Sequence, residues 1–204
     1  MIAAGTAVAV FLDRDGVLND PVLDPADGRP ESPLRAADVT LVPGAAQACR
    51  TLRDAGRMLV VVSNQPAAAK GKAALEDLWA VHDRVAELLE AASATIDDWY
   101  YCFHHPEAVV PALRGPCECR KPADGMLRDA AAVHRIVLAE SWMVGDSDAD
   151  VAAGTRAGCR TVLVEHPGSA HRRGGLARPS ATARDLRDAA ARIVTAPKMP
   201  SVNP

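Results

Sequence analysis

The sequence predicts an α/β fold in which helices cover both faces of a parallel sheet, a Rossmann-like three-layer arrangement. Short apolar runs alternate along the chain with longer segments that carry apolar residues at helical spacing, and this alternation is typical of parallel sheets. Polar side chains follow several of the runs directly, which is where such sheets bind their ligands. At 204 residues the chain is long enough for one domain with a full core and short for two.

The predicted strands are five short apolar runs, at residues 7–12, 58–62, 99–103, 142–144 and 161–164. The first predicted helix opens at Val42-Pro43-Gly44 and ends at Gly56, a residue typical of helix ends. The next covers residues 72–92, whose apolar residues form one stripe. Further helices are expected over residues 122–137, from the end of the 145–150 segment through residue 157, and over residues 181–194.

Two segments are predicted to have little regular structure. Residues 19–38 are rich in Pro, Asp and Gly, and a loop of this length is more often part of a site than idle. Residues 1–166 are assigned to the folded core. Residues 167–204 are assigned to a C-terminal helix and a partly disordered tail of the same domain, with disorder expected over the last ten residues.

Asp13 and Asp15 come at the end of the first predicted strand, in the sequence Asp13-Arg14-Asp15-Gly16. In an extended backbone alternate residues point to the same side, so both carboxylates are expected to face one point and Arg14 to face away. Two converging negative charges are costly unless a cation joins them. The pair therefore predicts a divalent metal site, with one carboxylate free to attack and the other to move a proton. A plain turn is the alternative.

Polar residues at two other strand ends are expected to join this pair. Ser63 and Asn64 follow the second predicted strand, where small hydroxyl and amide groups are well placed to hold a phosphate. Asp146 follows the fourth strand and is predicted to be a metal ligand, with Asp150 supporting it. The alternatives are a turn hydroxyl for Ser63 and a helix N-cap for Asp146.

One loop carries four residues with metal-ligand chemistry, as a Cys-x-His pair followed by a Cys-x-Cys pair. Three thiolates and one imidazole make a closed tetrahedral set, which is typical of structural zinc. A zinc ion there would hold the loop and so fix Arg120 and Lys121, which follow the last cysteine. His105 is the alternative nitrogen ligand, although it precedes Pro106, and free thiols are the alternative to any metal. The predicted ligands are Cys102, His104, Cys117 and Cys119.

The composition excludes some classes of partner. Lys and Arg number 23 against 26 Asp and Glu, a formal net charge of −3, so no strongly basic face for nucleic acid is indicated. No apolar run approaches the ~20 residues of a membrane span, and no basic segment precedes the first apolar run. We therefore expect a soluble, cytoplasmic monomer that acts on a small molecule.

Four short motifs together resemble those of the haloacid dehalogenase-like (HAD) phosphohydrolases, in that family's order and at its strand ends. The motifs are DRDGVLN from residue 13, SNQ from residue 63, RKP from residue 120 and GDSDAD from residue 145. The resemblance implies that Asp13 is a nucleophile that forms an aspartyl-phosphate and that Asp15 is the acid and base. Dehalogenases of the family lack an acid at the second position, so Asp15 points to phosphoryl chemistry.

The resemblance also implies a metal and its ligands. The Mg²⁺ ligands would be Asp13, Asp15 through its backbone carbonyl or its side chain, and Asp146. The phosphoryl oxygens would be held by Ser63 and Lys121, together with Asn64. Arg120 suits a second, planar contact to anions of the substrate.

The zinc loop narrows the resemblance to one branch of the family. YYCFHHPE from residue 100 and CECRKPADGM from residue 117 are similar to the D-glycero-D-manno-heptose 1,7-bisphosphate 7-phosphatases and the related histidinol-phosphate phosphatases. This similarity implies removal of the 7-phosphate of the heptose and no large cap domain, for which the segments after Asp15 and Asn64 are too short. Histidinol phosphate and sugar phosphates in general are alternative substrates. A zinc-bearing binding module is the alternative outside enzymes.

Overall fold

The fold is built on a six-stranded parallel sheet with the strand order β5-β4-β1-β6-β7-β8. The structure is a computed structural model that describes residues 7–24, 28–175 and 177–197. The strands of the sheet are β1 (Ala9–Leu12), β4 (Met58–Asn64), β5 (Asp98–Cys102), β6 (Trp142–Gly145), β7 (Arg160–Val164) and β8 (Ala181–Ala183). The helices are α1 (Ala45–Asp54), α2 (Leu75–Ala91), α3 (Gly125–His134), α4 (Asp148–Arg156) and α5 (Leu186–Thr195).

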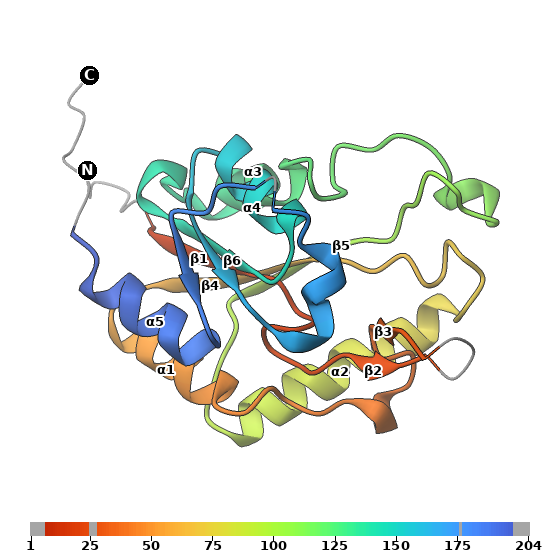
Figure 1. Ribbon diagram of the computed structural model, residues 1–204, viewed down its shortest axis with the longest axis horizontal. Coiled ribbons are helices and arrows are strands. Elements are labelled where there is room, and N and C mark those ends of the chain that lie inside the picture. Colours follow the sequence, from red (N-terminus) through yellow and green to blue (C-terminus); the bar gives the residue numbers. More distant parts are fainter. Residues whose placement is uncertain (1–6, 25–27, 176, 198–204) are drawn as a thin grey trace.

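Different helices cover the two faces of the sheet and form two apolar cores. Successive residues of a strand point to opposite faces, so Val10 and Leu12 of β1 pack in a core with α1, α2 and α5, whereas Ala9 and Phe11 pack with α3 and α4. Figure 1 shows these two groups of helices on either side of the sheet. The predicted three-layer fold is therefore confirmed.

Two segments differ from the prediction. The predicted loop over residues 19–38 contains a small hairpin, β2 (Val22–Leu23) with β3 (Pro30–Glu31), and a 3-10 turn at Ala36–Asp38. The helix predicted over residues 181–194 begins as the edge strand β8, and α5 starts only at Leu186, after its N-cap Asp185. Of the ten residues expected to be disordered, 198–204 lie outside the described residues.

Two elements beyond the predicted core boundary at 166, β8 and α5, pack against the rest of the fold. β8 pairs with β7, and α5 packs against α1 (Figure 1). In the described part of the chain, the regular elements between β1 and α1 are the hairpin and the 3-10 turn, and residues 65–74 between β4 and α2 form turns. Among the helices that the structure describes, α2 included, there is none with both the length and the apolar character for crossing a membrane.

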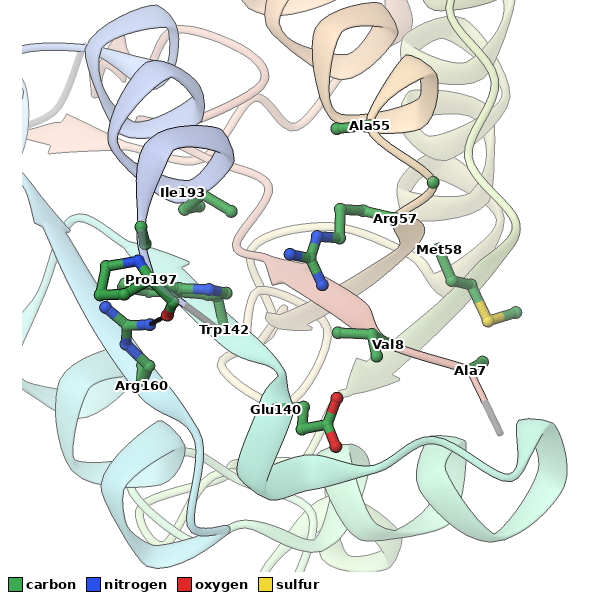
Figure 2. Close-up of a pocket in the computed structure, with 12 residues that line it drawn as sticks. Ala7, Val8, Ala55, Arg57, Met58, Glu140, Trp142, Arg160, Ile193 and Pro197 are labelled. Atoms are coloured by element: carbon green, nitrogen blue, oxygen red, sulfur yellow. Dashed lines mark hydrogen bonds between the residues drawn. The ribbon is translucent and has the colours of Figure 1, made fainter. Parts of the chain in front are cut away.

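Hollows are present at both ends of the sheet. One lies at the carboxyl ends of the strands and contains the residues singled out from the sequence. The other lies at the amino ends (Figure 2). It is lined by Met58, Trp142 and Arg160, the first residues of β4, β6 and β7, and by Val8, which precedes β1.

Candidate active site

The carboxyl ends of β1, β4 and β6 meet around a pocket of about 340 Å³. The β2–β3 hairpin, the segment before α3 and the 3-10 helix Pro167–Arg172 complete its wall. The sequence-predicted residues that line it are Asp13, Asp15, Ser63, Asn64, Arg120 and Lys121. The structure thus brings together the six residues predicted to act in catalysis or substrate binding.

Asp13 follows β1 directly and is held through one of its two carboxylate oxygens. Its Oδ1 accepts a 2.7 Å hydrogen bond from the backbone N–H of Arg14 and lies 3.0 Å from the ammonium of Lys121. Its Oδ2 has no hydrogen-bond donor in the part of the chain that the structure describes. Burial raises the pKa of Asp13, while Lys121 acts in the opposite direction. One oxygen is therefore anchored and the other is available to react.

Asp13, Asp146 and Asp150 form an acidic group whose oxygens lie within 4.8 Å of one another. Both oxygens of Asp146 are buried and find no donor among the described residues. Burial first, and then the charges of Asp13 and Asp150, raise the pKa of Asp146 to about 8. Oxygen ligands with uncompensated charge suit Mg²⁺. The group therefore fits the metal site predicted at Asp13 and Asp146, and it brings Asp150 into that site.

Gly16 allows the chain to turn close to this acidic group. Its φ is +82°, and a Cβ atom there would lie 2.0 Å from Oδ2 of Asp146. Any side chain at this position would displace the Asp146 carboxylate. This contact explains why a glycine is needed after Asp15.

Asp15 lines the same pocket, but its carboxylate lies outside the acidic group and is surrounded by donors. Burial raises its pKa, yet the Arg14 guanidinium and three further hydrogen bonds outweigh burial and hold the pKa of Asp15 below its usual value. The carboxylate form is therefore favoured. The donors are Arg14 Nε and Nη2 (3.2 and 3.0 Å to Oδ1), Asn19 Nδ2 (2.9 Å), Gln65 Nε2 (2.7 Å) and Ser32 Oγ (2.8 Å).

The expectation that Arg14 faces away from the two carboxylates is wrong. β1 ends at Leu12, and a turn replaces the extended backbone on which the alternation of side chains depends. The fully buried Arg14 consequently reaches Asp15. Because donors already occupy both oxygens of Asp15, the Mg²⁺ contact predicted for this residue is better suited to its backbone carbonyl than to its side chain.

Ser63 and Asn64 end β4 and have different contacts. The buried hydroxyl of Ser63 accepts a 3.1 Å hydrogen bond from Gln65 and keeps its own proton for a ligand. The amide of Asn64 pairs with the backbone of Lys121, donating to its carbonyl and accepting from its N–H, both at 3.0 Å. Asn64 therefore positions Lys121 in addition to lining the pocket.

The ammonium of Lys121 is buried among three acceptors. It donates to the carbonyl of Val62 at 2.7 Å and forms ion pairs with Asp13 and Asp150. Burial by itself would lower the pKa of Lys121, but the two carboxylates outweigh it and raise the pKa. Lys121 therefore stays charged. Asp150 also accepts from the backbone N–H of Ser147, the N-cap of α4, so Asp146 is not needed as a cap.

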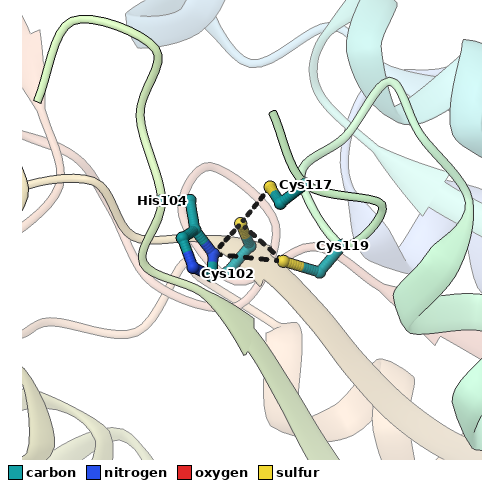
Figure 3. Close-up of side chains that lie close together, drawn as sticks. All are labelled: Cys102, His104, Cys117 and Cys119. Atoms are coloured by element: carbon teal, nitrogen blue, oxygen red, sulfur yellow. Dashed lines mark hydrogen bonds between the residues drawn. The ribbon is translucent and has the colours of Figure 1, made fainter. Parts of the chain in front are cut away.

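The four predicted zinc ligands converge, as Figure 3 shows. The sulfur of Cys102 lies 3.7 Å from that of Cys117 and 3.0 Å from that of Cys119, and Nδ1 of His104 lies 3.5 Å from the Cys119 sulfur. Zinc with Zn–S bonds of about 2.3 Å requires distances of roughly 3.8 Å between tetrahedral ligands. The set fits such a site. His105 lies outside it, with Nδ1 accepting from the backbone of Glu107.

Arg120 connects the cysteine loop to the pocket. Its Nη1 donates a 3.1 Å hydrogen bond to the carbonyl of His104, and its side chain lines the pocket. Lys121 follows directly in the chain. The predicted connection between the zinc loop and these two cations therefore has a structural basis in one hydrogen bond and one peptide bond.

Sequence reasoning missed the contacts of Asn19, Gln65 and Ser32 with Asp15. Gln65 completes the SNQ motif, so its position was visible, but its contacts with Asp15 and Arg14 were not. Ser32 lies in the segment predicted to be a loop, and no pattern in the sequence relates it to Asp15. Only the fold of the hairpin brings its hydroxyl to the site.

Comparisons with known proteins identify relatives of this chain. A family model described as HAD-hydrolase-like matches residues 118–189. Over 161 residues the chain is 42% identical to the D-glycero-D-manno-heptose-1,7-bisphosphate 7-phosphatase of Thermosynechococcus vestitus, covering 77% of this chain and 78% of the relative. Over 150 residues it is 37% identical to the D-glycero-beta-D-manno-heptose-1,7-bisphosphate 7-phosphatase of Rhodopseudomonas palustris, covering 74% and 79%.

A solved structure shows the same likeness in three dimensions. It is that of D,D-heptose 1,7-bisphosphate phosphatase from B. bronchiseptica, complexed with magnesium and phosphate, with a TM-score of 0.77 and 30% identity, covering 92% of this chain and 98% of that one. The fold and these relatives define a phosphoric monoester hydrolase of the HAD-like class. Within that class, the chain belongs to the family of D-glycero-D-manno-heptose-1,7-bisphosphate 7-phosphatases. The resemblance found in the motifs is thereby confirmed.

Proposed function

We propose that this chain removes the 7-phosphate of D-glycero-D-manno-heptose 1,7-bisphosphate through an aspartyl-phosphate on Asp13. The observation that carries the proposal is the state of Asp13 in the pocket. Its Oδ1 is anchored beside the buried ammonium of Lys121, and its Oδ2 accepts no hydrogen bond from the residues that the structure describes. The relatives from T. vestitus and R. palustris, both heptose-1,7-bisphosphate 7-phosphatases, support the choice of substrate.

In the first step Oδ2 of Asp13 attacks phosphorus. A phosphorus–oxygen bond to Asp13 forms, and the bond between phosphorus and the C7 oxygen of the sugar breaks. The leaving oxygen takes the proton that Asp15 has kept from the water of the preceding turnover. Lys121 stays charged next to Asp13 and offsets the negative charge of the phosphoryl oxygens. Ser63 has a hydroxyl proton to donate to one of these oxygens.

In the second step water attacks the phosphorus of the aspartyl-phosphate. Asp15 removes a proton from that water, the bond between Asp13 and phosphorus breaks, and inorganic phosphate leaves. The donors around Asp15 favour the carboxylate that this step needs. Asp15 then holds the proton that the next leaving oxygen requires.

We assign the Mg²⁺ site to Asp13, Asp146 and the backbone carbonyl of Asp15, with Asp150 beside it. When bound there, Mg²⁺ would neutralise charge on the phosphoryl group and on the acidic residues. The unpartnered oxygens of Asp146 support the assignment, and the B. bronchiseptica neighbour is complexed with magnesium and phosphate.

We assign a structural zinc to Cys102, His104, Cys117 and Cys119. Zinc would set the position of the His104 carbonyl and, through it, of Arg120. Arg120 would then contact a second anionic group of the substrate, for which its planar guanidinium is suited. The 1-phosphate of the bisphosphate is the group available.

The test is phosphate release from both anomers of the heptose bisphosphate and from histidinol phosphate, with and without Mg²⁺. We expect the heptose substrate to be preferred and Asp13→Asn to lower kcat about a thousandfold or more. Asp148→Asn is the matched control, because Asp148 belongs to the GDSDAD motif but does not line the pocket. Equal rates on all substrates indicate a general sugar phosphatase, and no turnover of any indicates a zinc-bearing binding module. The monomeric state and the cytoplasmic location stay predictions.

A further inference from the structure

A second pocket, of about 370 Å³, lies at the amino ends of the strands, opposite the active site. Its wall is formed by the starts of β1, β4, β6 and β7, the turn after α1 and the end of α5. None of its residues takes part in the proposed reaction. Its volume is within the range of pockets that bind small molecules, which begins at about 300 Å³.

Two arginines from different elements line this pocket. Figure 2 shows Arg57 pointing into it and Arg160 at its other side, against Trp142 and Pro197. Arg57 comes from the segment between α1 and β4, and Arg160 from the start of β7. Among the described residues neither forms an ion pair with a carboxylate. Nε of Arg57 is buried and has no acceptor there. An N–H of a charged group that is buried without a partner is costly, so this N–H favours an acceptor in the pocket.

Arg160 is held in a fixed orientation. Its guanidinium lies over the ring of the nearly buried Trp142, 3.9 Å from the ring centroid, and its Nη1 donates a 3.1 Å hydrogen bond to the carbonyl of Pro197. Burial and the nearby charge of Arg57 lower the pKa of Arg160. Two guanidinium groups thus repel each other across the hollow, in the same way as the carboxylates of the acidic group do at the other end of the sheet.

We propose that this pocket binds a small oxyanion, a phosphate or a carboxylate, between Arg57 and Arg160. Guanidinium groups present several N–H donors in one plane, and they match the oxygens of such anions. Glu140 is the one carboxylate among the lining residues that the structure describes, and it is exposed, so the lining keeps a net positive charge. The proposal does not depend on the proposed function.

The competing explanation is that the arginines only stabilise the carboxyl ends of helices. α1 and α5 both end at this pocket, and cations stabilise helix carboxyl ends. The hydrogen bond from Arg160 goes to Pro197, the residue after the C-cap of α5. That explanation requires no ligand, and it leaves Nε of Arg57 without a partner.

The test is a titration of the full chain, with its metals bound, followed by nuclear magnetic resonance. Sodium sulfate and sodium succinate are added separately at constant ionic strength, and the indole N–H of Trp142 and the Nε–H of Arg57 and Arg160 are observed. These signals report on this pocket alone, because anions at the active site act at the other end of the sheet. We expect saturable shifts that Arg57→Gln and Arg160→Gln each weaken by about tenfold or more. Arg156→Gln, an exposed arginine at the end of α4, is the control and should leave binding unchanged.

A response to sulfate alone supports a phosphate-bearing ligand, and a response to succinate alone supports a carboxylate. Absence of saturable shifts with both anions overturns the proposal. The arginines would then only stabilise the carboxyl ends of the helices. The same shifts in the double variant of Arg57 and Arg160 also overturn it. Each variant is titrated at a temperature where its spectrum is that of the folded chain. A change in stability alone therefore does not alter the binding curves.

Discussion

Gln65 and Arg14 together hold the carboxylate of Asp15. Oε1 of Gln65 accepts a 2.9 Å hydrogen bond from Nη2 of Arg14, and Nε2 of Gln65 donates a 2.7 Å hydrogen bond to Oδ2 of Asp15. The same Arg14 nitrogen lies 3.0 Å from the other oxygen of Asp15. The amide thus fixes both the orientation of Asp15 and the guanidinium that keeps it charged.

We expect Gln65→Leu to lower kcat/KM by about 10- to 100-fold, because it removes two hydrogen bonds to charged groups. It should also raise the pKa of Asp15, since Gln65 is one of the groups that hold this pKa down. The pH dependence of kcat/KM checks this, as the limb assigned to Asp15 should move to higher pH. Gln47→Leu, in an exposed position of α1, is the control. An unshifted pH profile would show that Gln65 does not set the proton affinity of Asp15.

The sheet and the strand-end residues could be predicted from the sequence because each rests on a local pattern. β1, β4 and β6 are apolar runs, and the residues that follow them must meet at one edge of a parallel sheet. β8 has the sequence Ala-Thr-Ala, which carries no such pattern, and its pairing with β7 depends on the tertiary fold.

The hydrogen bonds of the site were less predictable than its residues. The donor from Ser32 reaches Asp15 across 17 residues of chain through the hairpin, and no spacing rule relates the two. The contact of Arg14 with Asp15 follows from the turn after β1, whereas the prediction assumed that the strand continued.

The stability of the chain without Mg²⁺ should fall as the pH rises from about 4 to about 8. The pKa of Asp146 is about 8 in the fold and ordinarily 3.8, chiefly because the residue is buried. Between these values the folded state holds a proton that the unfolded state has lost, so the free energy of unfolding decreases with rising pH. Asp146→Asn should flatten this part of the profile, and Mg²⁺ should stabilise the original chain more than the variant. Denaturant unfolding at several pH values measures both effects, and an identical slope in the two chains would exclude this role of Asp146.

Lys72 should affect substrate binding more than turnover. Its ammonium pairs with Asp24 at 2.8 Å and with Glu31 at 3.2 Å, and so ties the β2–β3 hairpin to the turns before α2. The pairs are partly exposed, so together they should stabilise the position of the hairpin by only about 0.5 to 1 kcal/mol. If Lys72→Met removes this amount from the free energy of substrate binding, KM rises about two- to fivefold. Steady-state kinetics measures this, with Arg84→Met as a control that removes an ion pair away from the pocket. A fall in kcat with KM unchanged would contradict a role confined to the hairpin.

Loss of the proposed zinc should weaken substrate binding, because it releases Arg120. Cys117→Ser removes one of four converging ligands, so we expect less than one zinc per chain by metal analysis and a lower Tm. The carbonyl of His104 then no longer fixes the guanidinium of Arg120, and KM for a bisphosphate should rise about tenfold or more. KM for a monophosphate lacking the second anion should change much less, which separates this effect from general unfolding. Cys159→Ala, a buried cysteine outside the loop, is the control and should keep its zinc. Full zinc content in Cys117→Ser would exclude the four-ligand site, and an equal rise in KM for both substrates would exclude the connection through Arg120.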